Sequence, residues 1–397
     1  MIAKTTRLSL AFVLLALAAC GGGSSAGVAP AGAAGAAGSG GSAGAKAAAP
    51  DAPGPSPVGH ATFVVEDAAR ARTLRVELWY PAVEGARAAA IAGTALEDLE
   101  PAGARHDVLA ALVSAAPDGC TRKRVASASD VEAVKGPIPI VAFSHCLGCA
   151  RFDAAFVAER LASHGIAVVA PDHEGDTLWD VAMGTKAMLD SATLVLRAGD
   201  VRATLDAVLD GTSAAVPPAL RGRFDASRVG VFGHSFGSLT TGLVLQDDPR
   251  PRAGMGIAAP MEAFAPTMLA NVHQPLLFLL AAEDHSIGEV GNGIVRQNFE
   301  SANPPARLVE VADAGHWSFT DICALTSAFT PGCGMATRQE KGHLGEPFAY
   351  LANDAARAIA ASYAVAFFSA ELLDDAAARA FLAGAHPDDG TVTVTAR

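Results

Sequence analysis

Residues 228–238 read RVGVFGHSFGS, and this stretch decides the fold. The four apolar residues 229–232 are typical of a buried strand, and GHSFG then interrupts the run before a stretch that can form a helix. A serine on so sharp a turn needs glycine two positions before and after it, because a β-carbon at either flank would clash with the bent backbone. Ser235 is therefore a candidate nucleophile, although a chain with 40 glycines can also produce this pentapeptide by chance.

Two residues further along the chain complete the pattern expected around such a serine. Asp284 follows the apolar run PLLFLLAAE, and His316 lies in the turn DAGHW, directly after a predicted strand. A serine hydroxyl needs a base within hydrogen-bond reach and a third group that orients this base. Ser, acid, His is the order of α/β-hydrolases, so we predict that fold. Glu283 and Glu262 are alternative acids, because each also follows a predicted strand.

The other apolar segments alternate between strand and helix patterns. Strands are expected at 73–80, 138–144, 166–170, 254–259, 274–281 and 307–311. Helices are expected at 107–113, 152–164, 200–209 and 351–373. This alternation predicts a mostly parallel, doubly wound sheet with flanking helices. Residues 86–136 are interpreted as an insertion and 178–196 as a cap-like cover over the site.

Acyl transfer also needs hydrogen-bond donors for the negative charge that develops on the substrate oxygen. The backbone N–H of Phe236, directly after the serine, supplies one donor in an elbow of this kind. The second is expected from the loop HCLG at 145–148, with Leu147 as the candidate. We interpret His145 and His173 as residues that brace loops by hydrogen bonding.

The first residues of the chain are expected to form an export signal. In residues 1–19 two basic residues precede an apolar run, which ends in LAAC, so the segment resembles a bacterial lipoprotein signal with Cys20 as the lipidated residue. A plain secretory signal cleaved elsewhere is the alternative. Residues 20–57 are almost wholly Gly, Ala, Ser and Pro and indicate a flexible tether, which leaves 58–397 as the catalytic domain. The expected location is the bacterial cell envelope, with the membrane contacted through the lipid anchor only.

Charge and cysteine content narrow the function further. A net charge of -12 argues against nucleic-acid binding, which usually requires a basic surface.

With Cys20 lipidated, five cysteines remain, so at least one thiol stays unpaired in an oxidising compartment. Cys323 and Cys333 flank a compact loop and are the expected disulfide. The CxxC at 146–149 has no second metal-binding pair, so we expect no metal and no cofactor.

A family resemblance rests on longer stretches. Residues 143–177 (FSHCLGCARFDAAFVAERLASHGIAVVAPDHEGDT) resemble the FSHGLG loop, the helix and the strand entry of the platelet-activating-factor acetylhydrolase and predicted dienelactone-hydrolase group. They are more distantly similar to cutinase-like polyester hydrolases. With LRVELWYPA, GHSFG and AGHWSFTDIC, the resemblance extends from about residue 73 to residue 333.

The resemblance implies particular roles. Ser235 and His316 match the nucleophile and the base, and Leu147 and Phe236 match the oxyanion donors. Cys146 stands where the family pattern has glycine. The acetylhydrolases carry the acid after the earlier strand, which favours Glu262, whereas the cutinase pattern favours Asp284. The implied substrate is a short-acyl or lipid-like carboxylic ester.

The sequence therefore predicts a serine carboxylic ester hydrolase that works through an acyl-enzyme on Ser235. Within enzymes, a cutinase-like polyester hydrolase is the alternative. A non-catalytic envelope lipoprotein that retains a hydrolase fold for binding is the alternative from another class, and the intact Ser, acid, His order disfavours it.

Overall fold

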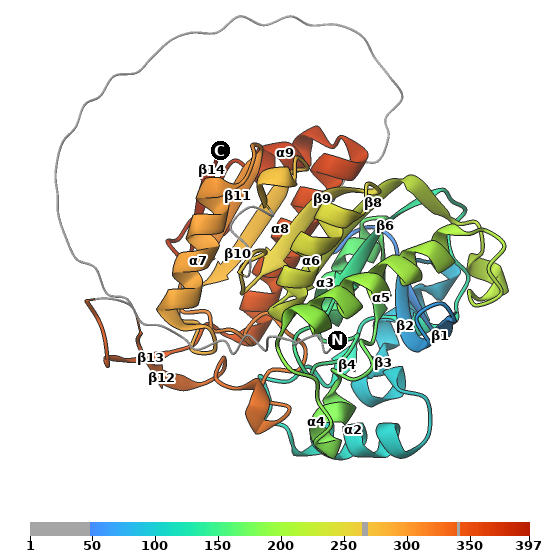
Figure 1. The fold of residues 1–397 in the computed structure, drawn as a ribbon, viewed down its shortest axis with the longest axis horizontal. Coiled ribbons are helices and arrows are strands. Elements are labelled where there is room, and N and C mark those ends of the chain that lie inside the picture. The colour runs from blue at the N-terminus through green and yellow to red at the C-terminus, as the bar shows by residue number, and fades with distance from the viewer. Residues whose placement is uncertain (1–47, 264–268, 340–341) are drawn as a thin grey trace, which may run out of the picture. The chain divides into compact units, whose positions relative to one another are not determined.

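The computed structural model describes residues 48–263, 269–339 and 342–397 (Figure 1). The predicted signal at 1–19, Cys20 and the predicted tether as far as residue 47 lie outside the described residues. The end of the tether segment packs on the protein. Gly54 N–H donates to Ser163 Oγ over 2.9 Å, and Ser56 N–H donates to the Ser163 carbonyl over 3.1 Å.

Among the described residues, ten strands form one sheet in the order β14-β11-β10-β9-β8-β6-β7-β2-β1-β5. The strands are β1 (Val58–Asp67), β2 (Arg72–Pro81), β5 (Ala128–Ser129), β6 (Ile138–Ser144), β7 (Ala167–Pro171), β8 (Phe224–His234), β9 (Pro251–Ile257), β10 (Leu276–Ala281), β11 (Ala306–Val311) and β14 (Val392–Ala396). Neighbouring strands from β7 through β6, β8, β9 and β10 to β11 are parallel, whereas β2 and β14 pair antiparallel to them. The sheet is mostly parallel, as predicted.

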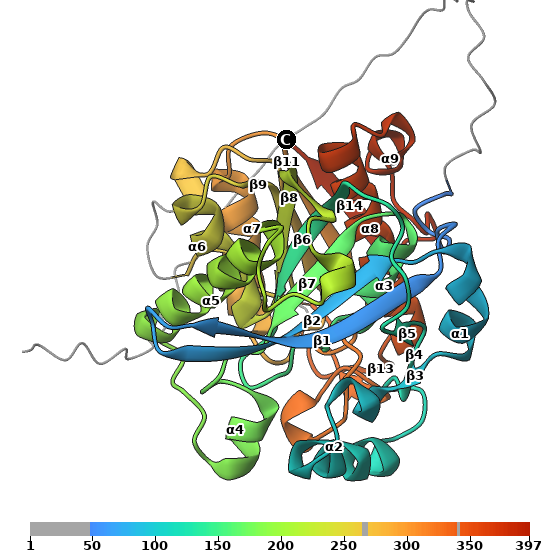
Figure 2. The same ribbon diagram turned by 90° about the vertical axis from the view of Figure 1, so that its right-hand side faces the viewer.

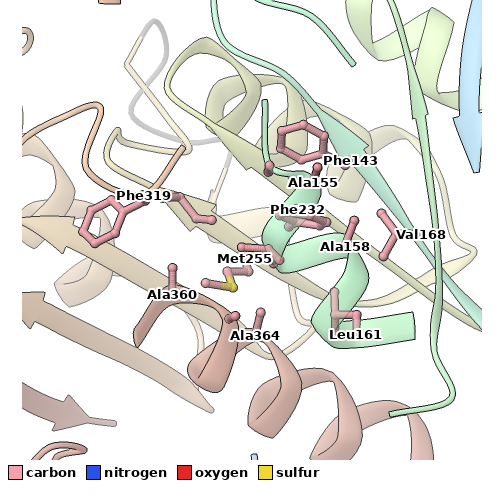
Figure 3. Packing of buried hydrophobic residues seen from close by; sticks show 14 of the residues in the cluster. Phe143, Ala155, Ala158, Leu161, Val168, Phe232, Met255, Phe319, Ala360 and Ala364 are labelled. Carbon is pink, nitrogen blue, oxygen red and sulfur yellow. The ribbon is translucent and has the colours of Figure 1, made fainter. Parts of the chain in front are cut away.

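Helices cover both faces of this sheet (Figures 1 and 2). One face carries α3 (Ala155–Ser163), α8 (Asn353–Leu373) and α9 (Ala376–Phe381), and the other carries α5 (Ser191–Leu209), α6 (Phe236–Asp247) and α7 (Gly288–Ser301). Successive strand side chains point to opposite faces. On β6, Val141 and Phe143 therefore enter one core, and Ile140 and Ala142 enter the other. Figure 3 shows the first core, where Phe143 lies close to α3.

Helix α8 packs beside α3 on the same face of the sheet, where it contacts β8 and β9. Within the described part of the chain, it is the one helix long and apolar enough to cross a membrane by length and composition. In the folded protein 83% of its apolar window is buried. Small residues such as Ala360 and Ala364 face the core (Figure 3). The apolar character of α8 on all sides is thus accounted for by packing inside the protein.

The predicted insertion is folded. It contains α1 (Arg87–Ala92), β3 (Thr94–Ala95), α2 (Ala104–Ala115) and β4 (Arg124–Val125), and the predicted cover contains α4 (Leu178–Met183). Helices α2 and α4 lie at the same end of the molecule in both views (Figures 1 and 2). The Arg105 guanidinium lies 5.7 Å from the Trp179 ring centroid, and it pairs with Glu174 over 3.3 Å. The remaining elements are η1 (Glu84–Ala86), η2 (Leu96–Leu99), η3 (Pro218–Leu220), η4 (Leu269–Asn271), η5 (Ser327–Phe329), β12 (Met335–Thr337) and β13 (Pro347–Ala349).

Stability should depend on pH through His60, a buried residue of β1. Its Nδ1 lies 3.0 Å from Ser127 Oγ, and burial lowers the pKa of His60 from 6.5 to about 4. Between pH 6.5 and about pH 4, His60 is protonated in the unfolded chain and neutral in the folded chain. The contribution of neutral, buried His60 to stability is therefore complete above pH 6.5 and is lost as the pH falls. From about pH 7.5 to about pH 5, this residue should lower the free energy of unfolding by about 2 kcal/mol. Urea unfolding of the wild type and of His60→Asn at both pH values measures this loss, and equal losses in the two proteins would contradict it.

Candidate active site

Ser235 lies at the junction between β8 and α6. Its backbone angles are φ 55° and ψ -122°, a region that residues other than glycine rarely adopt. The conformation is held by the Ser235 N–H, which donates to the Ile257 carbonyl over 2.9 Å. A β-carbon at Gly233 would collide with the carbonyl of Gly237, and one at Gly237 would collide with the carbonyl of Ser144. Both glycines of GHSFG are therefore required by close backbone approach.

The structure brings together the three residues expected to act on the substrate. His316 Nε2 lies 2.8 Å from Ser235 Oγ, and its Nδ1 lies 2.7 Å from Asp284 Oδ2. The other carboxylate oxygen of Asp284 accepts the N–H groups of Ser286 and Ile287. With the Nδ1 proton donated to Asp284, Nε2 is left as the acceptor for the serine hydroxyl. His316 and Asp284 are both buried, so this chain of hydrogen bonds is shielded from water.

The two alternative acids are engaged elsewhere. The Glu262 carboxylate accepts the Leu269 N–H over 2.9 Å. Glu283 pairs with Arg338 over 3.2 Å. His316 Nδ1 faces Asp284, so Asp284 occupies the position of the acid in this structure.

The loop that carries His316 is fixed by hydrogen bonds that the sequence did not indicate. His234 Nε2 lies 2.9 Å from the His316 carbonyl oxygen. Ser318 Oγ accepts the Gly315 N–H over 2.9 Å and donates to the Gly332 carbonyl over 2.8 Å. His234 occupies a variable position of the GxSxG pattern, so the motif gave no signal of this role.

The expected oxyanion donors belong to one apolar cluster. Phe236 is the first residue of α6, where the N–H has no acceptor within the helix. Its side chain packs with Leu194 and Leu239, and the half-buried Leu147 packs against this cluster. The loop at 145–148, called the oxyanion loop below, is thereby held next to the start of α6.

His145 braces the oxyanion loop, as the sequence suggested. Its Nδ1 lies 2.7 Å from the Cys146 carbonyl, and its Nε2 lies 3.0 Å from the His173 backbone nitrogen. Burial, and then the neighbouring His173 and Arg197, hold the pKa of His145 well below its ordinary value. The ring is therefore neutral at pH 7 and can donate from Nδ1 and accept at Nε2.

The predicted disulfide between Cys323 and Cys333 is wrong. Cys333 pairs with Cys120, with 5.7 Å between their Cα atoms, and Cys323 is a buried free thiol. The reason is that the insertion folds back onto the segment after His316. Thr121, the neighbour of Cys120, donates from Oγ to the Cys323 carbonyl over 2.6 Å. A partner 213 positions away leaves no signal in the local spacing.

The second disulfide joins Cys146 to Cys149 across the oxyanion loop. Ligand atoms of Cys146, Asp153 and His234 lie within 4.8 Å of one another, which makes them a possible metal-binding group within the described ranges. With the Cys146 sulfur bonded to Cys149, this group offers one nitrogen and one carboxylate. Structural zinc sites use four protein ligands and catalytic ones three, so the residues do not fit a zinc site of either kind.

Removing the long-range disulfide should destabilise the protein. Cys120→Ala is expected to lower the free energy of unfolding by about 2 to 5 kcal/mol, because the bridge closes a very long loop in the unfolded chain. Chemical denaturation without reductant measures the loss. Cys323→Ala is the matched control and should leave the bridge intact. A Cys120→Ala variant as stable as the wild type would contradict a stabilising bridge between Cys120 and Cys333.

A mostly parallel sheet with helices on both faces, together with a serine, a histidine and an aspartate joined at the carboxyl ends of its strands, defines an α/β-hydrolase. The family model of platelet-activating factor acetylhydrolase, isoform II, matches residues 41–187 and 196–332. The chain belongs to this family, and the family and fold expected from the sequence are confirmed.

Two related proteins support this assignment. Platelet-activating factor acetylhydrolase from Bos taurus is 26% identical over 222 residues, which is 48% of this chain and 49% of the bovine protein. The chain thus matches about half the length of this curated relative. The solved structure of a ferulic acid esterase from Streptomyces cinnamoneus superposes with a TM-score of 0.59 at 25% identity, over 85% of this chain and 96% of the esterase.

Proposed function

We propose that the protein is a serine carboxylic ester hydrolase that acts through an acyl-enzyme on Ser235. The observation that carries this proposal is the chain of hydrogen bonds from Ser235 Oγ through His316 to Asp284, with distances of 2.8 and 2.7 Å. Family membership and the solved esterase relative support the same class of reaction.

The reaction follows from the positions of these groups. Ser235 Oγ attacks the ester carbonyl carbon while His316 Nε2 takes the hydroxyl proton. The carbonyl oxygen becomes an oxyanion, which accepts the N–H groups of Leu147 and Phe236. The C–O bond to the alcohol breaks, and His316 returns the proton to the leaving oxygen. Water, deprotonated by the same histidine, then attacks the acyl carbon. The bond from this carbon to Ser235 Oγ breaks as His316 returns the proton to Oγ, and the acid is released. Asp284 holds the imidazole in the required tautomer and stabilises its charged form.

The proposed substrates are short-acyl or lipid-like esters. The bovine relative is named an acetylhydrolase, which supports a small acyl group, and the solved relative is named an esterase, which supports a carboxylic ester. The apolar cluster of Leu194, Phe236 and Leu239, with Leu147 packed against it, supports an apolar substrate portion beside the nucleophile. We expect no cofactor in this chemistry and, at a net charge of -12, no nucleic-acid partner.

We also propose that the enzyme is held at the cell envelope by lipid on Cys20. The support is the LAAC sequence after the basic and apolar residues of 1–19. Fatty-acid labelling of the full-length protein in a bacterial host tests this location, with Cys20→Ser as the control that should lose the label.

Two measurements on the full-length protein test the enzymatic proposal. A fluorophosphonate probe should form a covalent adduct on Ser235, which mass spectrometry of the digested protein can locate. A series of p-nitrophenyl esters of increasing acyl length should show hydrolysis that favours the shorter members. Absence of both the adduct and hydrolysis would support a non-catalytic binding protein.

A further inference from the structure

Arg197 of α5 is buried beneath the oxyanion loop. Its side chain is 1% exposed. The guanidinium donates to the His145 carbonyl and lies 3.4 Å from the Cys146 carbonyl and 3.2 Å from Ser144 Oγ. It also forms an ion pair with Asp176, which is 2% exposed. One side chain therefore binds the carbonyl groups of two successive residues in the loop.

These contacts set the direction of the proposed donor. In a trans peptide the C=O and N–H groups point in opposite directions. Because the Cys146 carbonyl faces Arg197, the N–H of Leu147 in the same peptide group points away from Arg197. On the other side of Leu147, the Gly148 N–H donates to Asp176 Oδ1 over 2.8 Å. Together with His145 Nδ1, which lies 2.7 Å from the same Cys146 carbonyl, the Arg197–Asp176 pair thus holds the peptide groups on both sides of Leu147.

The same guanidinium contacts the second donor segment. Its central carbon lies 4.7 Å from the centroid of the Phe236 ring. Its Nε lies 3.3 Å from Thr240 Oγ1, one turn further along α6. Arg197 is therefore in contact with both segments that carry the proposed oxyanion donors.

A purely stabilising role accounts poorly for this pair. Moving two charges out of water costs free energy that their attraction only partly offsets, so buried ion pairs are often no more stabilising than apolar residues of similar size. What apolar residues could not supply is a set of directed hydrogen bonds to the two loop carbonyls.

We propose that Arg197, paired with Asp176, is a positioning residue that orients the N–H group of Leu147 and holds the oxyanion loop against the start of α6, where the Phe236 N–H lies, before substrate binds. This inference rests on the proposed ester hydrolysis. Donors that are already oriented stabilise the transition state without reorganisation during the reaction. Arg197 acts through these peptide groups and does not itself contact the reacting atoms.

Arg197→Lys and Arg197→Met test the inference in the full-length protein with a p-nitrophenyl ester. We expect kcat to fall by about 10² to 10³ for Arg197→Met and less for Arg197→Lys, because loss of one oxyanion donor has an effect of this size. KM should stay within about threefold, because the ground-state ester gains little from these donors. The rate of Ser235 labelling by a fluorophosphonate should fall in parallel with kcat. If Arg197→Met does not fold, Asp176→Asn provides the same test through the other member of the pair.

Arg151→Lys is the matched control. Arg151 is equally buried, but its charged partners are Glu77, Glu100 and Asp172, outside the oxyanion loop. It should lose thermal stability and keep kcat. If folded Arg197 variants kept kcat within about threefold of the wild type and lost only stability, the positioning role would be overturned. A wild type that hydrolyses no ester and takes no label would instead refute the proposed function, and the wild-type measurement separates these outcomes.

Discussion

Replacing Ser235 by alanine is expected to lower kcat for ester hydrolysis by at least about 10⁴-fold. The change removes the atom that would form the acyl-enzyme and that lies 2.8 Å from His316 Nε2. The backbone at this position has φ 55°, which an alanine tolerates about as poorly as a serine, so the variant should keep the stability of the wild type. Hydrolysis of a p-nitrophenyl ester and thermal unfolding, measured on the same preparation, test both expectations.

Ser362→Ala is the matched control for this variant. Ser362 is a buried helical serine of α8, and its Oγ donates to the Ala358 carbonyl over 2.7 Å. Because the Ala358 carbonyl still accepts the helical N–H of residue 362, its replacement should change stability by no more than about 1 kcal/mol and leave kcat unchanged. If Ser235→Ala kept more than about a tenth of wild-type activity, which exceeds the residual rate of enzymes that lack their nucleophile, another residue would have to be the nucleophile.

The central strands could be predicted because burial on both faces makes them continuous apolar runs. The segments that became β6, β7, β8 and β10 are of this kind, and the glycines around Ser235 marked the turn between β8 and α6. The outer strands β1 and β14 were missed. Side chains of β1 alternate between buried and exposed along its second half, and β14 is mostly exposed, so neither forms an apolar run.

The principal site residues could be predicted because each follows a strand and the chain order is diagnostic. The supporting residues could not. Residue 197 fell between the predicted cover at 178–196 and the predicted helix at 200–209, whereas α5 runs without interruption from Ser191–Leu209. Val195 and Leu196 are exposed. The first turns of α5 therefore carry apolar residues on both the exposed and the buried face, and the sequence there lacks the amphipathic pattern of a helix. Contacts of Arg197 with a loop about 50 residues earlier in the chain depend on the tertiary fold alone.

The second large loss of activity is expected from a change of the acid, Asp284. Asp284→Asn should lower kcat by about 10⁴-fold, because an amide can donate to Nδ1 and so favours the tautomer with the proton on Nε2. In that tautomer His316 cannot accept the proton of Ser235. Steady-state kinetics measure the loss, and labelling of Ser235 by a fluorophosphonate should slow for the same reason.

Glu262→Gln separates the two acids that the sequence left open. The Glu262 carboxylate accepts the Leu269 N–H over 2.9 Å, a contact that glutamine can keep through its carbonyl oxygen. Because His316 Nδ1 already faces Asp284 at 2.7 Å, Glu262→Gln should keep kcat within about threefold of the wild type, far from the loss expected at the acid itself. The reverse result, a large loss in Glu262→Gln and little change in Asp284→Asn, would mean that the base changes partner when substrate binds. The acid would then follow the strand β9, where the acetylhydrolase resemblance places it.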